Sequence, residues 1–145
     1  MQIIVKPTDY TDTSLSDEWN RCSAWLEAAL YYSNGTHTID DVLETVQRGD
    51  AQFWHYPDAA VVTEIMDYPQ KRVLRYWLAG GNLKTLLKVE PSIRHWSQLW
   101  GCVGIEIIGR KGWHRVLKGF KQTGIILAKD MYCLLYTSDA ADDVY

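Results

Sequence analysis

The chain has 145 residues, a hydrophobic fraction of 47% and a formal net charge of -3 at pH 7. This length fits one domain with a sizeable core, and no stretch reaches the roughly 18 to 20 apolar residues that a membrane-spanning helix needs. The chain also lacks the excess of basic residues that drives binding to nucleic-acid phosphates. We therefore expect a cytoplasmic protein whose main partner is neither a membrane nor a nucleic acid.

One strand and two helices are expected in the first 50 residues. Residues 3–5 form a short apolar run that a proline stops, as at the end of a strand. Between residues 19–30, apolar side chains recur at three- and four-residue spacing, which predicts an amphipathic helix. Thr38 and Asp41 have the spacing of a capping box and predict the start of a second helix, which Gly49 closes.

Three strands are expected next, at residues 51–56, 59–66 and 72–78. The connections between them are short, which is typical of an antiparallel meander. Because side chains alternate along a strand, the third strand should place Trp77 and Leu78 on opposite faces of the sheet.

A Gly-Gly turn at residues 79–82 should link the third strand to a helix. That helix covers residues 83–100, and we expect it to be interrupted or to restart at Pro91, because a helix tolerates proline best in its first turn. A glycine turn before a helix can direct free backbone N–H groups at one point, where a phosphate can bind. Alternatively, the glycines serve only a turn that needs unusual φ values.

The remaining elements are a strand at residues 103–108, a short helix at 113–118 and a strand at 124–128. The long helix before the first of these strands is the crossover that a parallel strand pair requires. The predicted fold class is therefore a single α/β domain over residues 1–132. Its central sheet should be mixed, mostly antiparallel and flanked by helices.

This order of elements resembles the GNAT superfamily of acyl-CoA N-acyltransferases over residues 1–130. In that family, a loop with an Arg or Gln and two spaced small residues follows the fourth strand, and its amides hold the pyrophosphate of coenzyme A. Here Gly80 and Gly81 match the glycines, while their spacing from Arg75 differs. The resemblance implies a GNAT-like fold that binds acetyl-CoA through the residues that end the third strand and begin the helix. These residues are Gly80, Gly81, Asn82 and Leu83.

The family often has a tyrosine in the helix after the fifth strand, which protonates the leaving thiolate, and a Gly-Phe pair at the end of that helix. Gly119 and Phe120 match the pair, but Trp113 and His114 stand at the start of the helix. His114 is therefore a candidate acid in place of the tyrosine, or else an exposed residue at a helix start. Several short segments, such as Thr38-Ile-Asp-Asp, are also similar to small proteins of this fold from tailed phages.

Two carboxylates are candidates for the base that acyl transfer to an amine requires. Glu64 and Glu106 each lie in an otherwise apolar strand, where partial desolvation raises the pKa of a carboxyl group. The alternative is that each side chain points to solvent from a half-exposed sheet.

A basic cluster surrounds the short helix near residue 115. The cluster can hold the nucleotide phosphate of coenzyme A, or nucleic acid, or it can be a solvated face. Its members are Arg110, Lys111, Arg115, Lys118 and Lys121. Cys22 and Cys102 are expected to be free thiols. No histidine spacing indicates a metal site.

Residues 133–145 resemble the in-frame translation of a transposase-type sequencing adapter, so we expect a non-native tail after residue 132, as in a fragmentary metagenomic gene. The segment has no periodic apolar face. It contains three of the 18 acidic residues, so 15 remain to balance the 15 Lys and Arg residues.

Two functions follow from these features and from the resemblance. The first is acyl-CoA-dependent N-acyltransfer to a small-molecule or protein amine, with acetyl-CoA as the cofactor. The alternative is a non-catalytic interaction or assembly protein with a degenerate GNAT fold and a phage protein as its partner. Fold alone does not decide between them.

Overall fold

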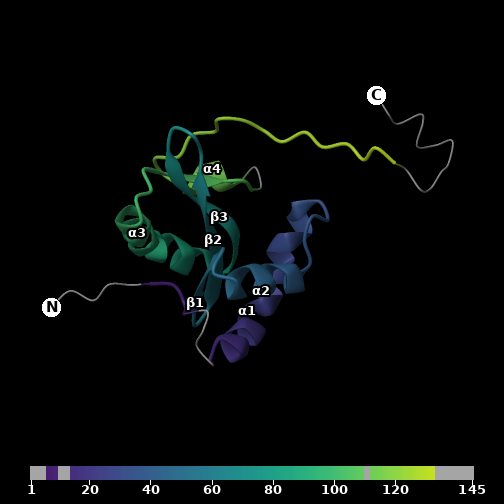
Figure 1. Cartoon of the computed structure of the whole chain (residues 1–145), viewed down its shortest axis with the longest axis vertical. Helices are drawn as coiled ribbons and strands as arrows, with labels where there is room; N and C mark the ends of the chain where they lie inside the picture. Colours follow the sequence, from purple (N-terminus) through teal and green to yellow (C-terminus); the bar gives the residue numbers. More distant parts are fainter. Residues whose placement is uncertain (1–5, 10–13, 110–111, 133–145) are drawn as a thin grey trace. The chain divides into compact units, whose positions relative to one another are not determined.

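The computed structural model describes residues 6–9, 14–109 and 112–132. The sheet has four strands in the order β1-β2-β3-β4, and its first three strands are antiparallel while β3 and β4 are parallel (Figure 1). The strands are β1 (Gln52–Tyr56), β2 (Ala59–Asp67), β3 (Arg72–Gly81) and β4 (Gly104–Ile107). The helices are α1 (Leu15–Leu30), η1 (Tyr31–Ser33), α2 (Ile39–Gln47), α3 (Leu83–Leu99) and α4 (Trp113–Val116). This mixed, mostly antiparallel α/β sheet confirms the predicted fold class.

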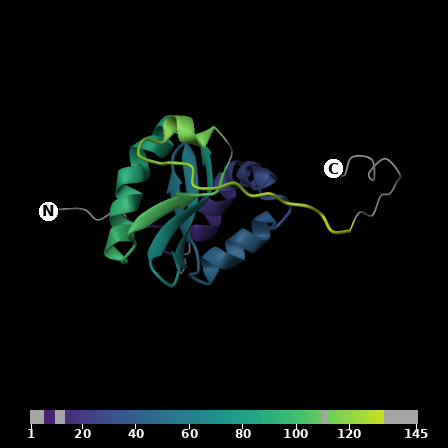
Figure 2. The same cartoon turned by 90° about the horizontal axis from the view of Figure 1, so that it is seen from above.

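Helices cover both faces of the sheet. α1 and α2 lie against one face and α3 lies against the other (Figure 2). Within the described residues, none of the helices is long and apolar enough to span a membrane. The chain divides into two units, residues 1–113 and residues 114–145, and the sheet with α1, α2 and α3 belongs to the first.

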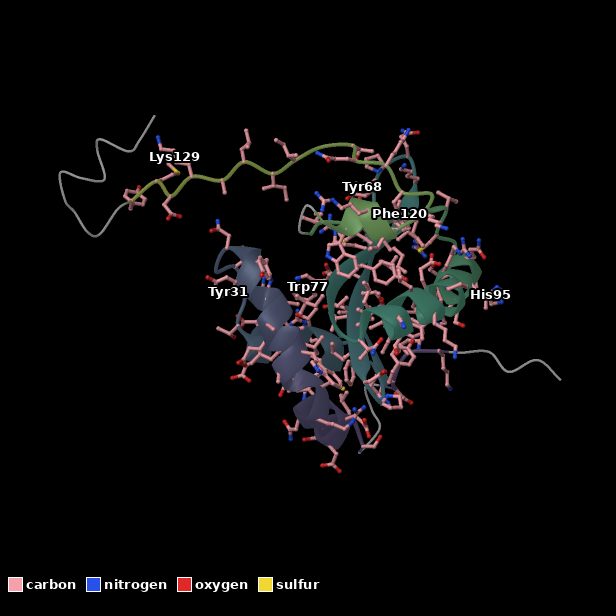
Figure 3. The ribbon with its side chains drawn as sticks, turned by 180° about the vertical axis from the view of Figure 1, so that it is seen from behind. Tyr31, Tyr68, Trp77, His95, Phe120 and Lys129 are labelled. Carbon is pink, nitrogen blue, oxygen red and sulfur yellow. The ribbon has the colours of Figure 1, made fainter. Side chains whose placement is uncertain are left out.

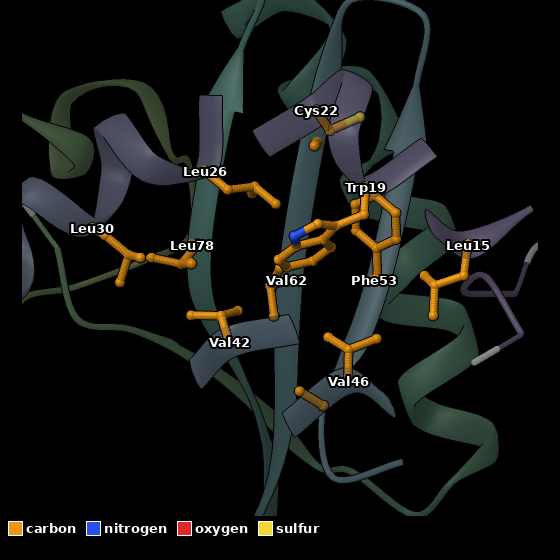
Figure 4. Close-up of a cluster of buried hydrophobic side chains, with 12 residues drawn as sticks. Leu15, Trp19, Cys22, Leu26, Leu30, Val42, Val46, Phe53, Val62 and Leu78 are labelled. Carbon is orange, nitrogen blue, oxygen red and sulfur yellow. The ribbon is translucent and has the colours of Figure 1, made fainter. Parts of the chain in front are cut away.

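The core between the sheet and α1 and α2 is built on the predicted helical periodicity. Trp19, Cys22 and Leu26 of α1 are buried at successive turns (Figure 4). They pack with Phe53 and Val62 of the sheet, and the rings of Trp19 and Phe53 meet edge-on at 5.0 Å between centroids. This packing fixes α1 on the sheet.

A second core lies under α3. Trp54, Leu74, Ile93 and Trp96 are buried there, and the indole N–H of Trp54 donates a hydrogen bond of 3.0 Å to Oγ1 of Thr63. The two cores bury the first five residues of β2, together with Val73, Leu74 and Leu78 of β3. These strands are therefore a rigid platform for any side chain near their ends.

The capping box of α2 is confirmed. The backbone N–H of Asp41 donates to Oγ1 of Thr38 at 3.2 Å, and the backbone N–H of Thr38 donates to Oδ2 of Asp41 at 2.8 Å. We expect Thr38→Ala to lower the free energy of unfolding by about 1 kcal/mol, because the helix loses its cap. Urea denaturation measures this loss. Thr36→Ala, one turn outside the helix, is the control, and an equal loss in both variants would contradict the role of the cap.

Two predictions around α3 are wrong. The strand β3 does not end at residue 78, because Ala79, Gly80 and Gly81 continue to pair with β2, so there is no separate Gly-Gly turn. The helix α3 is not interrupted, because Pro91 lies inside it. Proline costs this helix the hydrogen bond to the carbonyl of Leu87. Leu87 is exposed, so water can form a hydrogen bond with that carbonyl. The helix continues because its last turns bury Ile93 and Trp96.

The predicted strand at residues 124–128 is also wrong. The structure describes these residues without helix or strand, and Ile125, Ile126 and Leu127 are exposed. β-branched residues favour a strand only where a neighbouring strand accepts their hydrogen bonds. The predicted strand at residues 3–5 and the tail at 133–145 lie outside the described residues. Close to the former, the backbone N–H of Thr8 donates to the carbonyl of Phe53 at 2.8 Å.

Candidate functional site

The parallel strands β3 and β4 separate after Tyr76, so Trp77 is the first residue of β3 that no longer pairs with β4. They pair from Val73 opposite Gly104 to Tyr76 opposite Ile107. On the other side of β3, Thr63 pairs with Tyr76 and Val62 pairs with Leu78, so Trp77 is an extra residue. A bulge of this kind bends its strand and increases the local twist. Within the part of the chain that the structure describes, β3 therefore continues from Trp77 to its end with β2 as its only strand partner.

The bulge also changes which face the side chains occupy. Trp77 and Leu78 both pack on the side of α1 and α2, where Trp77 is seen in Figure 3. The strict alternation expected from the sequence is therefore wrong at Leu78, because the inserted residue shifts the pattern by one. From Ala79 onward the alternation resumes, and Ala79 packs on the side of α3.

Gly80 and Gly81 are needed for close packing at the end of β3. A Cβ on Gly80 would lie 2.6 Å from the carbonyl oxygen of Trp25 in α1. Gly81 has a φ of +100°, and a Cβ there would lie 2.4 Å from the carbonyl oxygen of Asp58. Real Cβ atoms do not approach backbone atoms this closely. The packing of α1 and of the β1–β2 turn is thus enough to explain both glycines.

The end of β3 leads directly into the first turn of α3. Asn82 caps this helix, since its Oδ1 accepts a hydrogen bond of 3.2 Å from the backbone N–H of Thr85. The backbone N–H of Asn82 donates to the carbonyl of Asp58 at 2.8 Å. The first two backbone N–H groups of the helix, those of Leu83 and Lys84, have no protein acceptor within the described residues. Of the four residues predicted to hold a ligand, Gly80 and Gly81 lie in the sheet and the N–H of Asn82 is used within the protein. The N–H of Leu83 alone remains available.

A carboxylate of the protein lies beside this helix start. Oδ2 of Asp58 accepts a hydrogen bond of 3.0 Å from the hydroxyl of Thr85. An acidic group near a helix N-terminus is favoured by the helix dipole. The same charge opposes a second anion at that place.

The two carboxylates that the sequence offers as candidate bases lie on either side of one arginine. Glu64 of β2 lies opposite Arg75 of β3, and Arg75 lies opposite Glu106 of β4. The three side chains thus form a row across three strands on one face of the sheet. Sequence spacing did not indicate this row, because it depends on the register of the sheet.

Within the row, Glu106 is firmly held. Nε of Arg75 donates to Oε1 of Glu106 at 2.8 Å, and the hydroxyl of Tyr68 donates to the same oxygen at 2.8 Å. Nη2 of Arg75 also donates to the Tyr68 hydroxyl at 3.1 Å. Tyr68 comes from the turn between β2 and β3 (Figure 3). A carboxylate with this many donors is a structural anchor for Arg75.

Glu64 is different from Glu106. It is half-buried, and within the described residues it has no hydrogen bond or ion pair of its own. Burial raises the pKa of the Glu64 carboxyl group, and the positive charges of Arg75 and His37 oppose this rise only in part. A half-buried carboxylate with a raised pKa and free oxygen atoms is suited to accept a proton.

The remaining predicted residues are not brought to this row by the described structure. His114 begins the second unit in α4, and its side chain lies outside the described residues, as do Arg110 and Lys111. Within the described part of the chain, no group of three His, Cys, Asp or Glu side chains can hold a metal ion. Cys22 and Cys102 are free, as predicted.

Sequence reasoning missed Arg75, Tyr68 and His37 as neighbours of the carboxylates. A signal existed for Arg75, which interrupts an apolar strand at the position that faces Glu64 once the β2–β3 hairpin is in register. Tyr68 and His37 lie in connections between elements, and no local pattern distinguishes them.

No family model matches the chain, and no curated protein sequence matches it significantly. A solved structure does match: the crystal structure of a possible acetyltransferase from Clostridium difficile 630. The TM-score is 0.51, the match covers 88% of this chain and 97% of that chain, and the sequence identity is 8%. At this identity the likeness concerns the fold alone. It agrees with the acetyltransferase-like fold that the sequence predicts.

Proposed function

We propose that the protein is an acyl-CoA-dependent N-acyltransferase that acts on an amine. The observation that carries this proposal is the separation of β3 and β4 at Trp77, in the strand that leads into α3, in a fold similar to that of a possible acetyltransferase. Ligands of open α/β sheets bind where neighbouring strands part at their carboxyl ends. Acetyl-CoA would supply the acyl group there as a thioester.

The residues at the start of α3 fit one part of such a ligand. The N–H groups of Leu83 and Lys84 are free to bind a phosphate oxygen. We propose that Arg110 and Lys111 contact the nucleotide phosphate, as the basic cluster suggests.

Glu64 is the proposed base. An amine is protonated near neutral pH and must lose a proton before its nitrogen can attack a carbonyl carbon. The Glu64 carboxylate can take that proton because burial raises its pKa toward neutrality. Glu106 and Tyr68 position Arg75, whose charge opposes the rise in the pKa of Glu64. His114 remains the proposed acid for the leaving thiolate.

Isothermal titration of the purified protein with coenzyme A, and with pantetheine as its diphosphate-free counterpart, tests the cofactor. We expect coenzyme A to bind more tightly than pantetheine and to shift the amide resonances of Leu83 and Lys84. If neither ligand binds at millimolar concentration, the proposed function is wrong.

Asp58→Asn should increase the affinity for coenzyme A by about three- to tenfold, because it removes a carboxylate beside the proposed diphosphate position. The affinity for pantetheine should not change. Glu44→Gln, which removes one exposed negative charge from α2, is the matched control. An equal increase in both variants, or an equal effect on both ligands, would show that Asp58 has no local role.

One observation favours the alternative function, an interaction protein without catalysis. Leu99, Trp100 and Val103 are exposed in and around the α3–β4 connection, and such a patch is typical of a protein–protein contact. A protein that binds no coenzyme A and that loses an interaction when Trp100 is changed to Ser would support this alternative.

A further inference from the structure

An arginine of α1 holds the turn between β1 and β2. The two residues of this turn are Pro57 and Asp58. The guanidinium of Arg21 donates from Nη2 to the carbonyl of Tyr56 at 3.0 Å and from Nη1 to the carbonyl of Pro57 at 3.2 Å. Hydrogen bonds from an ionised donor are stronger than those between neutral groups, and the planar guanidinium fixes their direction. Arg21 therefore sets the position of the turn relative to α1.

The guanidinium of Arg21 is itself held in place by its neighbours. Its Nε and Nη2 donate to Oε2 of Glu18, one turn earlier in α1, at 3.0 and 2.8 Å. The same oxygen lies 3.2 Å from Nδ1 of His55 in β1. The guanidinium also lies over the ring of Trp25, with 5.9 Å between Cζ and the ring centroid. These contacts already restrict a long side chain, so Arg21 loses less conformational entropy when it binds the turn.

The second residue of the same turn holds the start of α3. The carbonyl of Asp58 accepts a hydrogen bond of 2.8 Å from the backbone N–H of Asn82, and its Oδ2 accepts one of 3.0 Å from the hydroxyl of Thr85. The carbonyls of residues 56–58 thus connect α1 to the first turn of α3. Leu83 and Lys84, whose N–H groups are the proposed phosphate ligands, lie in sequence between the two residues that Asp58 binds.

Close packing makes this connection tight. A Cβ on Gly81 would lie 2.4 Å from the carbonyl oxygen of Asp58, and a Cβ on Gly80 would lie 2.6 Å from the carbonyl oxygen of Trp25 in α1. There is thus little space between the turn, α1 and the end of β3. A displacement of the turn therefore also displaces the residues that follow Gly81.

We propose that Arg21 positions the diphosphate site of coenzyme A through the β1–β2 turn, an inference that rests on the proposed acyl transfer. Arg21 is a positioning residue, because its guanidinium binds backbone carbonyls of the protein. Its hydrogen bonds fix Asp58, and Asp58 fixes the first turn of α3, which carries the N–H groups of Leu83 and Lys84. Donors that are already oriented bind a phosphate more tightly, because binding does not have to order them.

Hydrogen exchange of the Asn82 N–H tests this connection without any ligand. NMR compares the parent with Arg21→Gln and with Arg48→Gln, in which an exposed arginine that pairs with Asp50 at 3.1 Å loses the same charge. We expect Arg21→Gln to speed exchange at Asn82 about fivefold, because its acceptor carbonyl is less firmly held. The effect is modest because the guanidinium is partly exposed.

The N–H of Val103 is the internal reference, because it donates to the carbonyl of Arg72 at 2.9 Å, at the other end of β3. Its exchange should not change in either variant, and Arg48→Gln should behave as the parent at Asn82. Equal exchange at Asn82 in all three proteins overturns the positioning role of Arg21. An increase of the same size at Asn82 and Val103 also overturns it, because that result shows a general loss of stability.

Titration with coenzyme A and with pantetheine relates the connection to the ligand. Arg21→Gln should bind coenzyme A about three- to tenfold more weakly than the parent does, and pantetheine, which has no diphosphate, with unchanged affinity. Arg21→Lys should recover part of the loss, since an ammonium group can bind one of the two carbonyls. Arg48→Gln should bind both ligands as the parent does.

The outcomes separate the role of Arg21 from the proposed function. If Arg21→Gln binds coenzyme A as tightly as the parent, the positioning role is wrong while the proposed function stands. An equal loss in Arg21→Gln and Arg48→Gln shows a general effect of charge and also overturns the role. A parent that binds neither ligand overturns the proposed function and the positioning role together.

Discussion

Glu64→Gln should lower the turnover of acyl transfer by about 10²-fold or more and leave the affinity for coenzyme A within about twofold. General-base assistance is typically of this size, and an interaction made only in the transition state affects turnover without affecting binding of the ground state. Gln has the shape of Glu but cannot accept the proton. Steady-state release of free thiol from acetyl-CoA, with a primary amine as acceptor, measures the loss.

The pH dependence gives a second measure of the same role. The base must be ionised to act, and burial raises the pKa of the Glu64 carboxyl group. The ratio kcat/KM should therefore fall as the pH falls through this raised pKa, at a higher pH than an exposed glutamate would give. In Glu64→Gln this fall should disappear. An unchanged acid limb in the variant would assign the titration to another group.

Glu106→Gln is the matched control, because it makes the same chemical change one strand away in the row. Glu106 is bonded to Arg75 and Tyr68, so its loss releases Arg75 and should lower stability more than Glu64→Gln does. Its effect on turnover should be smaller. If Glu106→Gln removes activity and Glu64→Gln does not, the roles proposed for the two carboxylates are reversed.

The sequence predicts well those elements that depend on local patterns. The helical periodicity from Trp19 to Leu30 and the capping box at Thr38 gave α1 and α2, and the short connections gave the three antiparallel strands. The length of α3 also gave the parallel pairing of β3 with β4. These features depend on residue propensities and on the spacing of residues that are close together in the sequence.

Features that depend on tertiary packing were not predictable. The bulge at Trp77 depends on how β2 and β3 align, and nothing in the local sequence indicates an extra residue there. The helix α3 continues through Pro91 because its C-terminal half buries Ile93 and Trp96. That burial outweighs one lost hydrogen bond, but the sequence rule for proline considers only the bond.

The candidate site shows the same division. Glu64 was identifiable because a carboxylate in an apolar strand is unusual. Its relation to Arg75 and Glu106 requires the sheet register, and the contact of His37 with Trp77 in the same strand as Arg75 requires the position of the loop before α2. The two glycines were identifiable as special, but their contacts with Trp25 and Asp58 come from elements far away in sequence.

Gly81→Ala should lower the free energy of unfolding by about 2 to 4 kcal/mol, as expected where a strained φ and a steric overlap coincide. The positive φ of +100° at Gly81 disfavours any side chain, and the new Cβ would overlap the carbonyl oxygen of Asp58 at 2.4 Å. The strand end and the β1–β2 turn must then move apart. Guanidinium denaturation followed by tryptophan fluorescence measures the change.

Gly101→Ala is the control that separates conformation from overlap. Gly101 also has a positive φ, +87°, but a Cβ there would meet no atom within 4 Å. It should cost only about 1 kcal/mol, the conformational penalty alone. The difference between the two variants then measures the close packing at Gly81. If Gly81→Ala is as stable as Gly101→Ala and yet loses the binding of coenzyme A, the glycine serves the ligand and not the packing of the sheet end.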